Sequence, residues 1–423
     1  MDDTAAPASR ASRVTAAPRQ PGRALPEPGP AGAGPCPSAG TGYTLGRVTD
    51  ADARRYHRSQ LVLAIASGAA SAAVLAAWIW SGAAPVLATA LAERLPSRAP
   101  SHAVIVALVL GAVGGSSAVI TFPLDVLRGF VLPRRAGLLI QSGPSWLADR
   151  AKVQALGGGL ALAAFEVIYA LLVVSPAAWW LWATAVLAAG SLLVAAIVPV
   201  VVVPLFFRLT PLRDPDLRER VLALAARVGV TAAEVAVADL SRKGRAVNAA
   251  VVGLGRTRRI LVSDTLLASF PRDEIEVVLA HELAHHARGH LSRGLGFQTV
   301  LLLGALWAAH WALDAWSRPL GFAGPADPAG VPLVALVLSG LGLLLTPAAA
   351  AWSRRLEREA DAVALEVTRA PAAFVAAMER LGTLNLAERR PNRLTAWLTA
   401  THPPLEQRIA FARAAAEPPA GTA

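Results

Sequence analysis

The most informative stretch of the chain is residues 281–316, which read HELAHHARGHLSRGLGFQTVLLLGALWAAHWALDAW. Its first five residues have the spacing H-E-x-x-H. In a helix, residues four apart lie on one face, so His281 and His285 can bind the same metal ion. The apolar run 297–316 follows and is long enough to cross a hydrocarbon core, which needs about 20 residues. The stretch therefore predicts a metal-binding helix beside a membrane span.

Glu282 lies between the two histidines and can take a proton from water that attacks a substrate. Pro271 favours the start of this helix, and Asp273 and Glu274 in its first turn favour it further because the helix dipole attracts acids there. Short helical matches to H-E-x-x-H also occur by chance. The motif alone therefore leaves open whether the helix is catalytic.

Composition indicates a membrane protein. Hydrophobic residues make up 54% of the chain, charged residues only 16%, and the mean hydropathy is +0.48. The apolar residues are also clustered in long blocks, which is the stronger sign. We expect six membrane spans: 61–80, 103–121, 156–175, 179–205, 297–316 and 331–350.

The formal net charge of +11 does not indicate nucleic-acid binding, because the charges flank the apolar blocks and no basic recognition helix is visible. In this position, arginine and lysine determine membrane topology. Their bias places the N-terminus, the loop after the second span, residues 208–296 and the C-terminus in the cytoplasm. An even number of spans also requires both termini on one side.

The order of blocks predicts the domains. Residues 1–57 are expected to be a disordered tail, and Cys36, the only cysteine, lies there and excludes a disulfide within the chain. A four-span membrane domain, 58–207, should follow. The third domain, 208–412, should contain the H-E-x-x-H helix, short strands at 235–240, 246–254 and 259–263, and a two-span insertion, 297–350. A second disordered tail should occupy 413–423.

A catalytic zinc site usually has three protein ligands. The metzincin pattern is excluded, because Arg288 and Leu291 occupy the places of its glycine and third histidine. The best alternative lies in residues 353–361, SRRLEREAD, where Glu357 and Asp361 share one helical face. One of them can bind the metal while the other holds a histidine. A solvated helix face with ion pairs remains the competing interpretation.

Other residues suggest how a peptide could bind. Residues 246–253 could form an exposed edge strand, to which an extended peptide can pair. Near the C-terminus, His402 or Arg408 could stabilise an oxyanion, although a loop histidine and a surface arginine are the simpler interpretation. His286 and His290 point away from the ligand face and are expected to pack or to support the ligands.

Together these segments resemble the type I CAAX prenyl endopeptidase family and its bacterial relatives, the HtpX membrane proteases, which are gluzincins. The resemblance extends over about residues 60–412, in the family's order, and the early-span loop favours the CAAX-type branch. The matching segments are HELAHHARGH (281–290), SRRLEREAD (353–361), THPPLEQRI (401–409), NAAVVGLGRTRRILVSDTLL (248–267) and FPLDVLRGFVLPRRAGLLIQS (122–142).

The resemblance implies one Zn²⁺ site and a peptide cleft. It implies that the zinc ligands are His281, His285 and Glu357. It implies catalytic or supporting roles for Glu282, Asp361 and His402. It implies substrate contacts for Asn248, Ala249, Ala250 and Arg408.

We therefore expect a mainly α, multi-pass membrane helical bundle of about six spans with a small α+β gluzincin domain in the cytoplasm. The expected activity is zinc-dependent endoproteolysis in the cell membrane, with membrane-associated, prenylated or misfolded protein substrates. Peptide or protein and membrane lipid are the expected partners. The alternative is a catalytically silent scaffold or transporter: Glu166 inside a predicted span hints at transport, and the intact Glu282 argues against silence.

Overall fold

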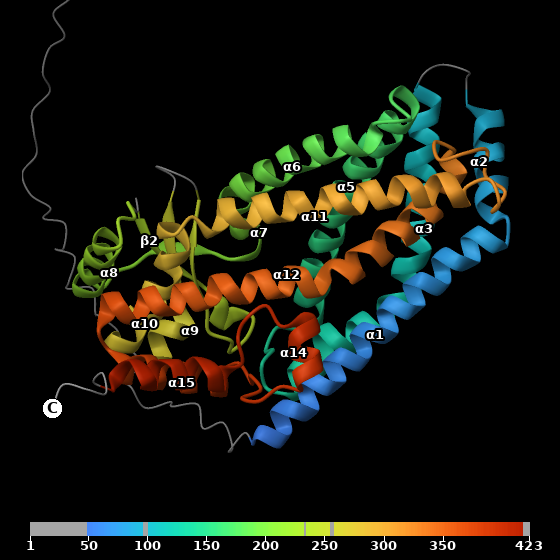
Figure 1. The fold of residues 1–423 in the computed structure, drawn as a ribbon. Coiled ribbons are helices and arrows are strands. Elements are labelled where there is room, and N and C mark those ends of the chain that lie inside the picture. The colour runs from blue at the N-terminus through green and yellow to red at the C-terminus, as the bar shows by residue number, and fades with distance from the viewer. Residues whose placement is uncertain (1–48, 96–99, 232–233, 254–257, 418–423) are drawn as a thin grey trace, which may run out of the picture. The chain divides into compact units, whose positions relative to one another are not determined.

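The computed structural model describes residues 49–95, 100–231, 234–253 and 258–417. Cys36 and most of the predicted N-terminal tail lie outside these residues, as do residues 418–423. Long helices form one part of the described chain and a small sheet with shorter helices forms the other (Figure 1). We call these parts the membrane domain and the sheet domain.

The membrane domain confirms the predicted class of fold, because six helices of the described chain are long and apolar enough to cross a membrane. Large apolar side chains on them are exposed, for example Val119 at 74% and Leu344 at 75%. Such surfaces are expected to face lipid. The helices are α1 (Asp50–Trp80), α3 (Pro100–Val126), α5 (Gly143–Val174), α6 (Trp179–Ile197), α11 (His290–Trp316) and α12 (Val331–Thr368). The short helix α2 (Ala83–Arg94) was not predicted.

Helices extend into both segments that were predicted to be disordered. Helix α1 begins at Asp50, because the Thr49 hydroxyl accepts a hydrogen bond from the Asp52 amide while the Asp52 carboxylate accepts one from the Thr49 amide. This capping box stabilises a polar helical extension that an apolarity pattern does not detect. At the other end, α15 (Leu405–Ala416) includes residues that were assigned to the C-terminal tail.

Prolines interrupt the fourth span. Helix α6 ends at Ile197 and continues through a π-helical turn, η2 (Val198–Val202), into α7 (Val203–Phe206). Proline lacks an amide hydrogen and clashes with the preceding turn, which explains the change in winding. A second π-helical turn, η1 (Leu127–Val131), joins α3 to α4 (Leu132–Arg135).

The sheet domain contains four strands in the order β1-β2-β4-β3, so β3 (Ala249–Val252) lies at an edge, as predicted. Strand β3 pairs antiparallel with β4 (Arg259–Ser263). The core includes Ile260, Leu279 and Phe374. The remaining elements are β1 (Leu209–Pro211), β2 (Glu234–Ala238), α8 (Pro215–Arg227), α9 (Asp264–Ser269), α10 (Arg272–Ala287), α13 (Pro371–Leu384) and α14 (Arg393–Thr399).

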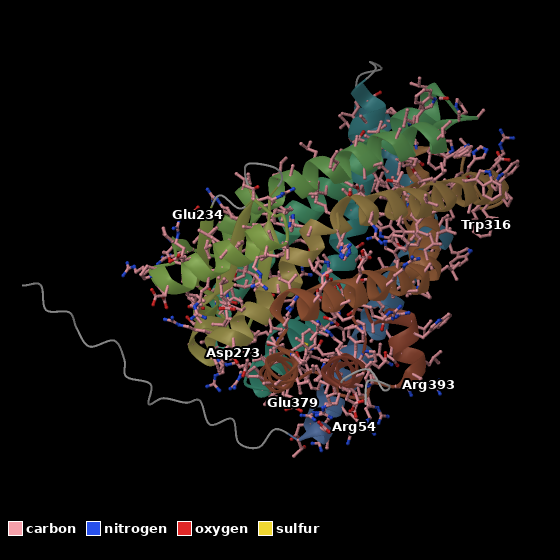
Figure 2. All side chains as sticks on the ribbon, turned by 60° about the vertical axis from the view of Figure 1, so that its left-hand side comes forward. Arg54, Glu234, Asp273, Trp316, Glu379 and Arg393 are labelled. Carbon is pink, nitrogen blue, oxygen red and sulfur yellow. The ribbon has the colours of Figure 1, made fainter. Side chains whose placement is uncertain are left out.

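Helix α10 does not run on into the fifth span. Gly289 has φ of 63°, which ends α10 and starts α11 in a new direction. Figure 2 shows the result: Asp273, at the start of α10, lies among charged side chains of the sheet domain, and Trp316 lies at the far end of α11.

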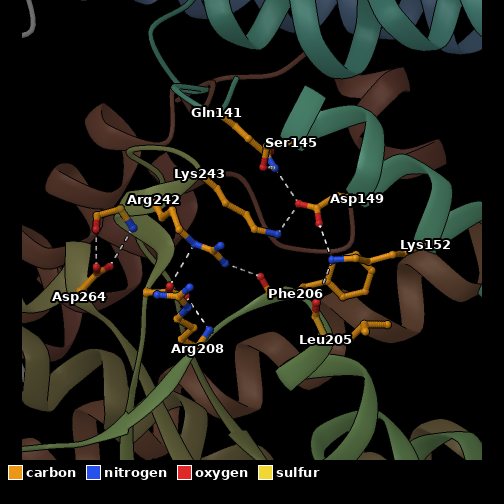
Figure 3. A network of polar contacts seen from close by, with 12 residues as sticks. Gln141, Ser145, Asp149, Lys152, Leu205, Phe206, Arg208, Arg242, Lys243 and Asp264 are labelled. Atoms are coloured by element: carbon orange, nitrogen blue, oxygen red, sulfur yellow. Dashed lines mark hydrogen bonds and ion pairs between the residues drawn. The ribbon is translucent and has the colours of Figure 1, made fainter. Parts of the chain in front are cut away.

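A polar network joins the two domains (Figure 3). Lys243, after β2, forms an ion pair of 2.5 Å with Asp149 of α5, and Lys152 binds the same carboxylate at 3.2 Å. Arg242 donates a hydrogen bond of 3.2 Å to the Phe206 carbonyl at the end of α7. The sheet domain is therefore attached to the ends of two spans.

Candidate metal centre

Close packing of α10 on α12 creates the site. Ala284 of α10 and Ala360 of α12 are fully buried against each other, and these small side chains let the helix backbones approach. Glu274, in the first turn of α10, is buried and forms a bidentate ion pair with Arg380 of α13, at 2.8 and 3.1 Å. These contacts fix α10 on two sides.

Three side chains present their donor atoms to one point. His281 Nε2 lies 3.3 Å from His285 Nε2 and 3.3 Å from Glu357 Oε2. His285 Nε2 lies 3.4 Å from Glu357 Oε1. All three groups offer a ligand atom within 4.8 Å of the others. The arrangement could hold one metal ion.

The spacing of these atoms fits zinc. Donors at about 2.0–2.1 Å from a tetrahedral Zn²⁺ are about 3.3–3.4 Å apart, which is the spacing found here. Glu357 Oε2 is also buried without a hydrogen bond in the described chain. Lone pairs that converge in this way require a proton or a cation between them. Two histidines, one carboxylate and an open fourth position are the usual donor set of a catalytic zinc site.

The two histidines are held through their Nδ1 atoms, opposite the Nε2 atoms that face the other donors. His281 Nδ1 donates to Asp361 Oδ1 at 2.9 Å, and Asp361 accepts two hydrogen bonds from Arg408 of α15, at 2.6 and 2.8 Å. His285 Nδ1 lies 2.8 Å from Nδ1 of the buried His290. Such contacts leave the Nε2 atoms to face a metal.

The site also shifts pKa values in opposite directions. Burial alone would lower the pKa of His281, but the nearby carboxylates of Asp361 and Glu357 outweigh it and raise the pKa to about 9. The two carboxylates thus favour positive charge at this imidazole. Burial lowers the pKa of His285 to about 4, helped by the charge on His281, and burial raises the pKa of Glu282 to about 7.

A cleft opens beside these donors. It has a volume of about 140 Å³, and its lining includes Glu282, Asn248, Ala249, His402 and Arg408. Ala250 does not line it: its backbone is in register with Leu261 on β4. His402 has an exposed side chain and places Nε2 3.5 Å from Glu357 Oε2. The cleft could therefore admit a peptide beside the donor set.

Other contacts at the site were not identified from the sequence. The side-chain oxygen of Asn385, at the end of α13, accepts a hydrogen bond of 3.1 Å from the Val247 amide, just before β3. His286 donates from Nε2 to the Val251 carbonyl at 2.8 Å. Both contacts hold the edge strand, and no spacing in the sequence indicates them.

Comparisons with known proteins agree with this geometry. The model of peptidase family M48 matches residues 211–416, and that of the CAAX prenyl protease N-terminal region, described by five membrane helices, matches residues 47–208. The Bacillus subtilis protein named uncharacterized metalloprotease YhfN is 28% identical over 300 residues, 70% of each chain. A protease HtpX homolog of Verminephrobacter eiseniae is 30% identical over 214 residues, 47% of this chain and 71% of that protein. The crystal structure of S. mikatae Ste24p has the same fold, with TM-score 0.75 and 24% identity over 86% of this chain and 88% of that one.

The six apolar helices of the described chain, the three candidate metal ligands and the match to a peptidase family define the class, a multi-pass membrane metalloprotease. The chain belongs to peptidase family M48. Membership of this family implies a bound metal and peptide or protein substrates.

Proposed function

We propose that the chain is a zinc-dependent endopeptidase in which His281, His285 and Glu357 hold one Zn²⁺. The spacing of their donor atoms, 3.3 to 3.4 Å, is the observation that carries this proposal. When bound, Zn²⁺ would polarise a peptide carbonyl and lower the pKa of water. A silent scaffold or transporter would have no need of this buried donor set.

In this proposal, Glu282 takes a proton from the attacking water and returns it to the leaving amine. The half-buried carboxylate lines the cleft and has a raised pKa, which favours proton transfer near neutral pH. Asn248 and Ala249 bind the peptide backbone at the edge of β3, and His402 stabilises the oxyanion. Arg408 lines the same cleft, but its guanidinium is engaged by Asp361, so it orients His281 through that carboxylate.

The substrates are proposed to be membrane-associated proteins. The match to a CAAX prenyl protease region supports prenylated substrates, and misfolded membrane proteins are the second class. The arginines near the start of α1 and those after the second span support a cytoplasmic orientation of the site, in the cell membrane. Cleavage of matched peptides with and without a farnesyl group distinguishes the two substrate classes.

The direct test compares purified wild-type protein with Glu282→Gln. We expect equal zinc content in both and a loss of peptide cleavage by a factor of about 10²–10⁴ in the variant, because only proton transfer is removed. Addition of a zinc chelator should abolish cleavage by the wild type, and added Zn²⁺ should restore it. Unchanged cleavage by Glu282→Gln would exclude this mechanism.

A further inference from the structure

A large cavity adjoins the cleft at the candidate metal centre. It has a volume of about 1,280 Å³, and its lining shares His402, Arg408, Asn385 and Met378 with the cleft. Pockets that hold small molecules usually have volumes of about 300–1,000 Å³. This cavity is therefore large enough for several residues of a peptide, and a peptide bound at the metal centre would extend into it.

Four exposed arginines line the cavity: Arg54, Arg55 and Arg58 of α1 and Arg128 of η1, which we call the rim arginines. Within the described part of the chain, none of the four forms an ion pair. Glu388 is the only acidic residue among the described residues that line the cavity. The rim thus carries an excess of positive charge, and clefts lined by one sign of charge attract ligands of the opposite sign.

The rim arginines occupy defined positions. The capping box at Thr49 fixes the start of α1, so Arg54 and Arg58 are four residues apart on one helical face. His57 donates from Nε2 to the Leu386 carbonyl at 2.8 Å, which ties α1 to the segment after α13. Gln60 donates to the Arg128 carbonyl at 3.0 Å and joins the two parts of the rim. Figure 2 shows Arg54 on α1 near Arg393, at the start of α14, and both helices contribute to the cavity lining.

We propose that the rim arginines bind a carboxylate of the peptide substrate, and so give the protease a preference for acidic peptides. The proposal rests on the proposed endopeptidase function. Because the cavity and the cleft share lining residues, one peptide can occupy both. Apolar side chains such as Leu61, Met378 and Leu381 line the same cavity. The preferred peptide therefore combines a carboxylate with apolar residues. The carboxylate is that of an aspartate, a glutamate or the C-terminus.

The test uses the full-length protein in phosphatidylcholine nanodiscs and a series of matched peptides. The reference peptide is neutral and amidated, and the others add two aspartates before the cleaved bond, two aspartates after it, or a free C-terminus. We expect at least one acidic peptide to have a KM about tenfold lower than the neutral peptide, because arginine forms strong charge-assisted hydrogen bonds with carboxylates. The peptide that shows the effect identifies the source of the carboxylate.

The double variant Arg54→Gln/Arg58→Gln should lose most of this difference between the KM values of the neutral and the acidic peptide. The matched control, Arg135→Gln/Arg218→Gln, removes the same charge from two exposed arginines that do not line the cavity, and should keep the difference in KM. Equal KM values for acidic and neutral peptides in the wild type would overturn the proposal. A rim variant that keeps its preference for acidic peptides would also overturn it if its cleavage rate no longer changed when phosphatidylglycerol was added to the nanodiscs. That result would assign the rim arginines to a lipid headgroup.

A binding measurement separates this proposal from the proposed function. Fluorescent peptides are titrated into Glu282→Gln and into the same variant with Arg54→Gln/Arg58→Gln, so that turnover plays no part. Tighter binding of the acidic peptide that requires the two arginines supports the carboxylate site even if no peptide is cleaved. Identical binding of both peptides refutes it even if the wild type is an active protease.

Discussion

The two sides of the candidate site differ in how they are held. On the α10–α12 side, His281, Glu357 and Asp361 are 7%, 6% and 1% exposed, and each contacts another member of the group. On the cleft side, the His402 side chain is 61% exposed and Asn248 is exposed as well. A rigid donor set can hold a metal in one geometry, while an open side can accept varied peptides. We call these the buried side and the open side.

After Glu282→Gln, the largest effect on catalysis should come from the open side. Replacing His402 by Ala removes a proposed oxyanion donor and should lower kcat by about 100-fold. Zinc content should not change, because the buried side is intact. Thr401→Val is the milder control, since it removes only the contact of 3.0 Å between Thr401 Oγ1 and His402 Nδ1. A large loss of zinc from His402→Ala would show that this histidine belongs to the buried side.

Asp361→Asn should weaken metal binding, because it changes the buried side. The change weakens the hold on His281 Nδ1 and leaves the Arg408 guanidinium without its charged partner. We expect zinc affinity to fall by about 10- to 100-fold, as is typical when a contact behind a metal ligand is lost. Competition with a chromogenic chelator measures it. Glu366→Gln, an exposed carboxylate on the same helix, should bind zinc like the wild type, and an equal loss in both variants would contradict this account.

His290→Ala should have a smaller effect on the same quantity. It removes the group that holds His285 Nδ1, and we expect zinc affinity to fall by about tenfold. His286→Ala is a matched control, because that imidazole binds the Val251 carbonyl on β3 and does not contact a proposed ligand. If His286→Ala weakened zinc binding more than His290→Ala, the assignment of His290 to the buried side would be wrong.

The sequence was most informative where chemistry and periodicity coincide. H-E-x-x-H and the apolar blocks predicted α10 and the six spans, because both depend on residues close together in the chain. The choice between Glu357 and Asp361 was different. Both lie on one face of α12, so spacing alone cannot show which carboxylate faces the Nε2 atoms. That depends on how far α12 is shifted along α10, which the packing of Ala284 on Ala360 determines.

Long-range contacts and caps explain the remaining differences. His290 reaches His285 because Gly289 turns the chain at φ of 63°, which a continuous helix would not do. The first turns of α1 are polar and form through a local cap at Thr49, so hydropathy placed them in a tail. That error concealed the rim arginines, which become a defined surface only when this segment is helical.

Zinc-edge X-ray absorption of the purified protein tests the central claim most directly. The account predicts two imidazole nitrogens and oxygen donors at about 2.0–2.1 Å from one zinc, with no sulfur, and loss of bound zinc in Glu357→Ala. An unchanged zinc spectrum in Glu357→Ala, or a shell without imidazole, would show that His281, His285 and Glu357 do not form the metal centre.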